Sequence, residues 1–306
     1  MMFDVCVVGH ITKDIVKSAD GEFQMPGGTA YYTAIALKNL GMSVAVITKI
    51  NDQDTFLLRE LEEEDIHVFL GESDWTTTFK NLYSDDTNTR VQWVKEVAKP
   101  FTVSDVSGCE ARIFHLGPLT KYDIPLEVIQ FLADRSTVSL DVQGLVRDFV
   151  KRGRGWTQVR HVVWEEKKEV LALVNIVKAN EEEARILSTK WNLTEIAVEL
   201  SNFGVEEVVI TCGSNPSLIY SKGKSYWISS YSAQDLGTID PTGCGDTYMA
   251  GYLFYREQTT KLDEVGKFAA MTATMKLEKG GPFRGSEEDV LDFANALGQP
   301  FLPKMT

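Results

Sequence analysis

Hydrophobic and polar positions in the first part of the chain follow two alternating periods. Apolar runs at 3–10 and 43–50 have the length and composition of buried strands. After each run, apolar residues recur at helical spacing, first over 30–40 and then over 54–66. In the second helix, four apolar residues should face the core: Phe56, Leu57, Leu61 and Ile66. This order of elements predicts a mostly parallel sheet with helices on both faces.

The same alternation returns beyond residue 110 and continues through the rest of the chain. A further strand is predicted at 67–70, and beyond residue 110 the predicted strands are 111–119, 136–144, the segment ending at Asn180, and 205–213, followed by a hairpin at 216–229. Predicted helices are 125–135, 181–188, 194–204, 246–257, 262–279 and 286–298. We therefore expect one doubly wound α/β domain over 1–306.

Two segments interrupt this pattern with the chemistry of β-hairpins. Residues 75–101 alternate Thr, aromatic and β-branched residues with polar ones around the turn-like SDDTN, and residues 11–26 have the same character around Asp20-Gly21. Together they predict a small antiparallel β-sheet that stands apart from the main sheet. Such a sheet can serve as a lid over a site or as a contact between subunits.

Composition excludes some classes of function. The 306 residues carry a formal net charge of -13, which argues against general binding to nucleic acid or to an anionic membrane. No segment reaches the roughly 20 apolar residues of a membrane helix. The four cysteines are widely separated and form no CxxC pair, as expected for reduced thiols in a cytoplasmic protein.

Candidate chemistry concentrates in DPTGCGD, residues 240–246, directly before a predicted helix. Gly243 and Gly245 let the backbone approach a ligand closely, and the helix start offers unpaired N–H groups and the positive end of its dipole. This combination predicts an anion cradle, with Asp246 placed to take a proton from an attacking nucleophile. The alternative is that Asp246 only caps a helix after a glycine turn.

Three further motifs stand in order along the chain: PGGTAYY from residue 26, NEEE at 180–183 and TCG at 211–213. Together with DPTGCGD they resemble the ribokinase family of carbohydrate kinases, also called the PfkB family, over essentially the whole chain. The closing motif of that family is D-T-x-G-A-G-D, so Pro241 and Cys244 depart from it. The resemblance implies a ribokinase-like fold and ATP-dependent phosphorylation of an alcohol.

The resemblance also implies roles for the glycine loop. Asp246 would be the catalytic base, and the backbone amides of Gly243, Cys244 and Gly245 would form the anion hole for the phosphoryl group. ATP would contact Gly243, Gly245, Thr211 and Gly213. Its adenine would lie between 211–218 and 268–277.

A metal is implied by the NEEE motif. Asn180 and Glu183 would organise Mg²⁺ near the ATP phosphates, through water, because Mg²⁺ keeps several waters. Read without the family, NEEE is an ordinary capped helix start with an acidic first turn. Asp240 matches a family position associated with a monovalent cation, and Pro241 beside it leaves activation by K⁺ open.

On the acceptor side, the resemblance implies that Asp14 binds substrate hydroxyls. Gly27 and Gly28 would bring the main chain close to the substrate, Tyr32 stands where sugar kinases often carry Asn, and Gln143 follows a strand that ends at the same edge. An aromatic ring at Tyr32 suits the apolar face of a ring-shaped substrate, as in inositol-kinase-like members of the family, or serves helix packing alone.

We expect a small polyhydroxylated substrate, namely a sugar, cyclitol or polyol, and a monomer or homodimer. A nucleoside kinase of the same fold is one alternative. A non-catalytic ligand-binding protein on this scaffold is another, although the presence of Asp246 and its glycines argues against it.

Overall fold

A computed structural model describes residues 2–18, 21–83, 90–149, 155–232 and 240–301. Within these ranges nine strands form a large sheet in the order β16-β15-β14-β13-β9-β8-β1-β4-β5. Every neighbouring pair from β14 to β5 is parallel, and β15 and β16 form an antiparallel edge. The strands are β1 (Met2–Val8), β4 (Val44–Ile50), β5 (His67–Glu72), β8 (Glu110–Leu116), β9 (Thr137–Asp141), β13 (Ile176–Asn180), β14 (Glu207–Cys212), β15 (Asn215–Ser221) and β16 (Lys224–Ile228).

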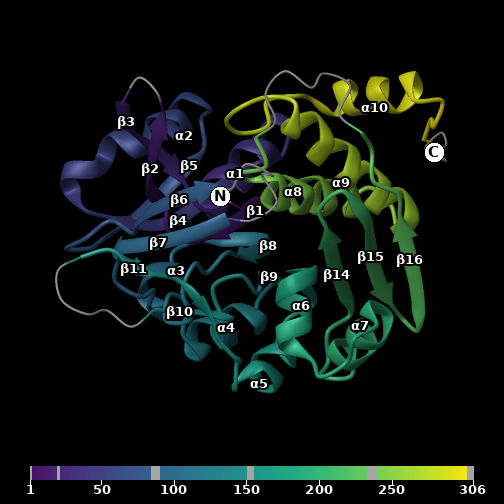
Figure 1. The fold of residues 1–306 in the computed structure, drawn as a ribbon, viewed down its shortest axis with the longest axis horizontal. Helices are drawn as coiled ribbons and strands as arrows, with labels where there is room; N and C mark the ends of the chain where they lie inside the picture. Colours follow the sequence, from purple (N-terminus) through teal and green to yellow (C-terminus); the bar gives the residue numbers. More distant parts are fainter. Residues whose placement is uncertain (1, 19–20, 84–89, 150–154, 233–239, 302–306) are drawn as a thin grey trace.

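Helices cover both faces of this sheet (Figure 1). One face carries α1 (Thr29–Asn39), η1 (Asp52–Leu58), α2 (Arg59–Glu63), α8 (Cys244–Arg256), α9 (Leu262–Leu277) and α10 (Glu287–Ala296). The other carries α3 (Val103–Val106), α4 (Leu126–Ala133), α5 (Lys167–Leu171), α6 (Glu181–Leu187) and α7 (Leu193–Ser201). Successive strand residues face opposite cores, since Val5 and Val7 join the first core while Cys6 and Val8 join the second. The predicted doubly wound α/β fold is confirmed.

A second sheet of five strands, in the order β11-β7-β6-β2-β3, accompanies the first within the described ranges. Its strands are β2 (Thr12–Ser18), β3 (Gly21–Gly27), β6 (Thr78–Tyr83), β7 (Arg90–Glu96) and β11 (Thr157–Gln158). The two predicted hairpins are present and join through a parallel pair of β2 with β6. Both strands leave the carboxyl edge of the large sheet, after β1 and β5, so they run in the same direction. The turn residues 84–88 and Asp20 lie outside the described ranges.

Some local expectations were wrong. Residues 54–66 do not form one continuous helix, because a 3-10 helix at 52–58 precedes the short α2. A 3-10 turn places successive residues about 120° apart, which moves the apolar stripe around the axis. Phe56 is therefore 52% exposed, while Leu57, Leu61 and Ile66 are buried as expected. The two-residue strands β10 (Arg147–Asp148) and β12 (Arg160–His161) were too short to give a sequence pattern.

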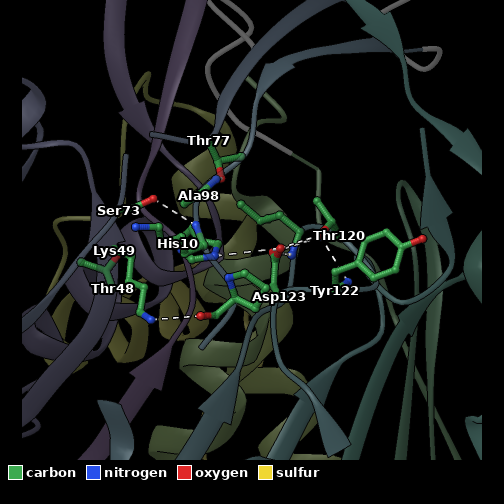
Figure 2. A network of polar contacts seen from close by, with 12 residues as sticks. His10, Thr48, Lys49, Ser73, Thr77, Ala98, Thr120, Tyr122 and Asp123 are labelled. Atoms are coloured by element: carbon green, nitrogen blue, oxygen red, sulfur yellow. Dashed lines mark hydrogen bonds and ion pairs between the residues drawn. The ribbon is translucent and has the colours of Figure 1, made fainter. Parts of the chain in front are cut away.

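A buried polar network holds the place where the small sheet leaves the large one (Figure 2). His10, just after β1, is fully buried, stacks on Phe101 at 4.5 Å between ring centroids, and has its Nε2 3.9 Å from Asp123 Oδ1. Lys49 at the end of β4 donates a 2.9 Å hydrogen bond to the carbonyl of Pro100. The segment that returns from the small sheet is thereby fixed against β1 and β4.

None of the described helices has the length and apolar content to cross a membrane.

Candidate active site

A cavity of about 760 Å³ opens at the carboxyl ends of the parallel strands, between the large and small sheets. Ligands of open α/β sheets bind at this edge. The cavity wall includes eleven of the residues singled out from the sequence: Asp14, Gly28, Tyr32, Gln143, Asn180, Thr211, Gly213, Gly243, Cys244, Gly245 and Asp246. Gly27 and Glu183 do not line the cavity, and each lies directly behind a residue that does.

The glycine loop closes one end of the cavity. Gly243 is the N-cap of α8 and has φ 77°, a left-handed conformation that favours glycine. A methyl group there would lie 2.4 Å from the ring of Tyr32, so the ring packs directly on the loop. Asp246 is the acidic residue of the first turn, in a part of the helix where a nearby anion is stabilised.

Cys244 anchors the same loop from its inner side. Its Sγ lies 3.8 Å from the carbonyl oxygens of Asp240 and Ala273, which places the thiol between the loop and α9. Burial raises the pKa of Cys244 to about 12, so the group is a neutral thiol at neutral pH. The side chain thus has a packing role. The backbone N–H of Cys244, which was predicted as an anion donor, already donates to the Pro241 carbonyl 3.2 Å away.

Lys178 brings a buried positive charge to the cavity, and the sequence analysis missed it. Its Nζ lies 2.9 Å from Asp141 Oδ2, and a methyl group on Gly245 would be 3.2 Å from that Nζ. Burial alone would lower the pKa of Lys178, but nearby carboxylates, with Asp141 first and Asp246 among them, raise it above its ordinary value. The signal in the sequence was a lysine inside the apolar strand NIVKAN.

A chain of polar side chains leads from Asp14 across the small sheet. Asp14 Oδ1 accepts a 2.7 Å hydrogen bond from Thr12 Oγ1, and its Oδ2 lies 3.4 Å from Asn81 Nδ2. Gln92 donates to Asn81 Oδ1 at 3.0 Å and accepts from Arg147 at 3.3 Å. The carboxylate of Asp14 is therefore held in place by neighbours on β2 and β6.

Gly27 belongs to this arrangement although it lines no cavity wall. It pairs with Thr12 across the β2–β3 hairpin, and a methyl group on it would be 2.6 Å from Asp14 Oδ2. Glycine at this position leaves room for the Asp14 carboxylate. The neighbouring Gly28 has φ 89°, and a methyl group added to it would lie 2.5 Å from the His10 carbonyl oxygen.

The NEEE motif forms a reciprocal capping box at the start of α6. Asn180 Oδ1 accepts from the Glu183 backbone N–H, and Glu183 Oε2 accepts from the Asn180 N–H, both at 2.8 Å. The second carboxylate oxygen, Oε1, is buried without a hydrogen bond and lies 3.8 Å from Arg147. Within the described ranges, no group of three or more His, Cys, Asp or Glu residues could hold a metal directly. The Oε1 atom of Glu183, which has no hydrogen bond among the described residues and lies behind Asn180 of the cavity wall, is the feature that fits Mg²⁺ held through water.

The two tyrosines of GGTAYY have different surroundings. Tyr32 lines the cavity, while Tyr31 is directed to Glu60, to which its hydroxyl donates a hydrogen bond. The two rings meet edge to face at 5.0 Å between centroids. Tyr32 and Phe79 of β6, which also lines the cavity, are therefore the Tyr and Phe residues of the described cavity wall.

The remaining wall comes from the segment between β9 and α5, which the sequence analysis read only in part. Arg147 and His161 lie opposite each other in the β10–β12 pair, and both line the cavity. His161 Nδ1 is 3.1 Å from Glu182 Oε1, and Gln158 of β11 lines the cavity as well. Gln143 donates its backbone N–H to Asp141 Oδ1 at 2.9 Å.

Comparison with known proteins assigns this fold to a class. The model of the pfkB family of carbohydrate kinases matches residues 2–289. A pyrophosphate-dependent kinase in the ribokinase family, solved with sulfate, has 27% sequence identity and a TM-score of 0.82, covering 94% of this chain and 99% of that one. The same kind of kinase with a pyrophosphate analog and myo-inositol has 26% identity and a TM-score of 0.81, with the same coverage. The fold is thus that of the ribokinase-like phosphotransferases.

Among curated proteins, the cytidine kinase of Thermococcus kodakarensis is 25% identical over 289 residues, which is 92% of this chain and 98% of that protein. The chain belongs to the pfkB family of carbohydrate kinases. It is a kinase of the class that acts on sugars or nucleosides, as the resemblance of its motifs implied.

Proposed function

We propose that this kinase transfers a phosphoryl group from a phosphoanhydride donor to a hydroxyl group of a small sugar, cyclitol or polyol. One observation carries the proposal: Asp14, Asp246 and the Gly243–Gly245 loop line the same cavity. Such a transfer needs a carboxylate that accepts hydrogen bonds from the acceptor hydroxyls and a second carboxylate that accepts a proton. It also needs a helix start rich in backbone amides.

In the proposed reaction, the acceptor hydroxyl is oriented by Asp14 and faces Asp246. The carboxylate of Asp246 takes the hydroxyl proton while the alcohol oxygen forms a bond to phosphorus. The bond between that phosphorus and the bridging oxygen of the donor breaks, and its electron pair leaves with the donor. Backbone N–H groups of the loop and the ammonium of Lys178 stabilise the charge on the phosphoryl oxygens.

Mg²⁺ would be held through water beside Asn180 and Glu183, whose Oε1 has no hydrogen bond within the described residues. When bound, it would neutralise charge on the donor phosphates. Arg147 and His161 line the same end of the cavity and add positive or hydrogen-bonding groups there. In this proposal Arg147 belongs to the donor side. It is the last residue of the hydrogen-bonded series that begins at Asp14.

Two donors fit this proposal. ATP is the donor that the family resemblance predicts, with Thr211 and Gly213 on its side of the cavity. Pyrophosphate is favoured by the solved relatives at 26–27% identity, which are pyrophosphate-dependent kinases. It is also favoured by the wall itself, because Arg147, His161 and Lys178 line it and no described residue of α9, where adenine was expected, does so. We therefore propose pyrophosphate as a donor to be tested beside ATP.

For the acceptor, a cyclitol or sugar is favoured over a nucleoside. A base would have to stack on Tyr32 or Phe79, yet these residues are only 2% and 3% exposed, and the Tyr32 ring packs against Gly243. The polar residues around Asp14, namely Thr12, Asn81 and Gln92, suit a ring with several hydroxyl groups. The relative solved with myo-inositol supports this choice. A nucleoside remains the second candidate because a cytidine kinase matches nearly the whole chain.

The test measures phosphorylated product from a panel of inositols, hexoses, pentoses and nucleosides, each with ATP and with pyrophosphate. Asp246→Asn should lower turnover on the active pair on the order of 10²- to 10⁴-fold, the range for loss of a general base. Asp263→Asn is the matched control, since Asp263 also lies in the first turn of a helix but is exposed on α9 and does not line this cavity. Full turnover by Asp246→Asn would refute the proposed base.

A further inference from the structure

Lys276 places a buried charge directly behind the glycine loop. Its side chain is 0% exposed on α9, and its Nζ donates a 2.7 Å hydrogen bond to the backbone carbonyl of Asp240 and lies 3.2 Å from Asp240 Oδ2. A buried ammonium without a partner costs several kcal/mol, on the order expected for any buried ion. The two oxygens of Asp240 compensate this charge, so the position of Asp240 depends on Lys276.

Asp240 passes this constraint on to the loop. Its Oδ1 accepts a 3.0 Å hydrogen bond from the backbone N–H of Thr242, which is the residue before Gly243. The thiol of Cys244 reaches the same Asp240 carbonyl that Lys276 binds. The Lys276 Nζ also lies 6.0 Å from the centre of the Tyr32 ring, which packs on Gly243 from the other side. A single positive charge thus sits beneath the residues that open the cavity toward the phosphoryl group.

We propose that the ammonium of Lys276 is a built-in monovalent cation that holds the 240–243 loop in its anion-binding conformation. Phosphoryl transfer then needs no exchangeable cation such as K⁺ or NH₄⁺. Lys276 is a positioning residue, because it acts through Asp240 and does not line the cavity. This inference rests on the proposed function in one respect, namely that the loop binds the transferred group.

The physical reason is one of charge and tethering. K⁺, NH₄⁺ and a lysine side chain carry the same single positive charge, but the lysine is covalently attached and is already in contact with a carboxylate and a carbonyl. A second cation at these oxygens would be repelled by the ammonium at close range. Loop geometry is therefore independent of the salt around the protein.

The first experiment compares wild-type turnover in KCl and in tetramethylammonium chloride at equal ionic strength. The expected result is the same rate in both salts. Activation of the wild type by K⁺ or NH₄⁺ over tetramethylammonium would overturn the inference, because it would show that an exchangeable cation completes the site.

The second experiment replaces the lysine by an uncharged side chain of similar length. In tetramethylammonium chloride, Lys276→Met should lose turnover on the order of 10²-fold, as when one stabilising group of an anion hole is removed. K⁺ or NH₄⁺ should restore part of the rate in a saturable way, which a merely structural role would not produce. Undiminished turnover, or a loss that neither cation reverses, would overturn the inference.

Lys267→Met on the same helix is the control, since its Nζ binds the Pro300 carbonyl 3.1 Å away and it lines a different surface. It should keep wild-type turnover in every salt. If Lys276→Met does not fold, Lys276→Gln takes its place in the same comparison.

Thermal unfolding separates this inference from the proposed function. K⁺ should raise the Tm of Lys276→Met relative to tetramethylammonium and leave the Tm of the wild type unchanged. This readout needs no substrate, so it decides the role of Lys276 even if no acceptor in the panel is phosphorylated. Equal Tm values for the variant in the two salts would refute the built-in cation and would leave the proposed function untouched.

Discussion

Replacing Gly243 by alanine perturbs the loop in two separable ways. Its φ of 77° is left-handed, which costs a residue with a side chain about 1–2 kcal/mol. The added methyl group would also lie 2.4 Å from two ring carbons of Tyr32, and overpacking of this kind costs about 1–3 kcal/mol. We expect the free energy of unfolding to fall by about 2–5 kcal/mol in total.

Gly281 provides the matched control, because its φ is 81° and no atom lies within 4 Å of an added methyl group. Gly281→Ala should therefore lose only about 1–2 kcal/mol, from backbone strain alone. Urea unfolding followed by circular dichroism measures both variants, and the difference between them isolates the contact with Tyr32. Equal losses in the two variants would refute the argument that the ring packs on the loop.

Turnover provides the second readout of the same pair. Gly243→Ala moves the loop and should reduce phosphoryl transfer on the order of 10²-fold, as for loss of an anion-hole donor. Gly281→Ala should leave transfer unchanged at temperatures where both variants are folded. Wild-type transfer by folded Gly243→Ala would show that the backbone of this loop does not contact the transferred group.

Three further predictions follow from the same contacts. Gly27→Ala should displace the Asp14 carboxylate, 2.6 Å from the added methyl group, and raise KM for the acceptor far more than KM for the donor in steady-state kinetics. Lys178→Gln should lose both turnover and stability, because it leaves the buried Asp141 without its partner. Adding Asp141→Asn removes that unpaired charge and should restore the stability, measured by urea unfolding, but not the turnover. Burial lowers the pKa of His115 from 6.5 to about 4. Between these two values the unfolded chain binds a proton that the folded chain does not, so the free energy of unfolding decreases as the pH is lowered. The loss is up to about 3 kcal/mol, at 1.4 kcal/mol per pKa unit. His115→Gln should flatten this dependence in urea unfolding at pH 7 and pH 4, and an unchanged slope would contradict it.

The main sheet could be predicted because its strands are continuous apolar runs separated by helices of clear period. The hairpins of the small sheet could also be predicted, since their alternation differs from that of the buried strands. The two-residue strands β10 and β12 could not, because so few residues contain no period. The outward turn of Phe56 depends on a local 3-10 geometry that hydrophobic spacing does not register.

The candidate site divides in the same way. Asp14, Asp246 and the glycines stand in short motifs whose chemistry can be read locally, and the structure brings them to one cavity. Lys178 and Lys276 could not be assigned from their motifs, because each acquires its meaning from a carboxylate far away in sequence, Asp141 or Asp240. Pairings of this kind depend on strand order and helix packing.

The packing of Tyr32 on Gly243 has a consequence for how such a protein can acquire new acceptors. A change at this tyrosine would disturb the loop together with the acceptor pocket, so the position offers little freedom for altering preference. Asn81 and Gln92 stand on the small sheet and hydrogen-bond to each other, to Asp14 and to Arg147, so they can be exchanged without a direct change to the loop. Directed evolution toward a different polyol should therefore accumulate its substitutions on the small sheet and leave the helix of the tyrosines unaltered.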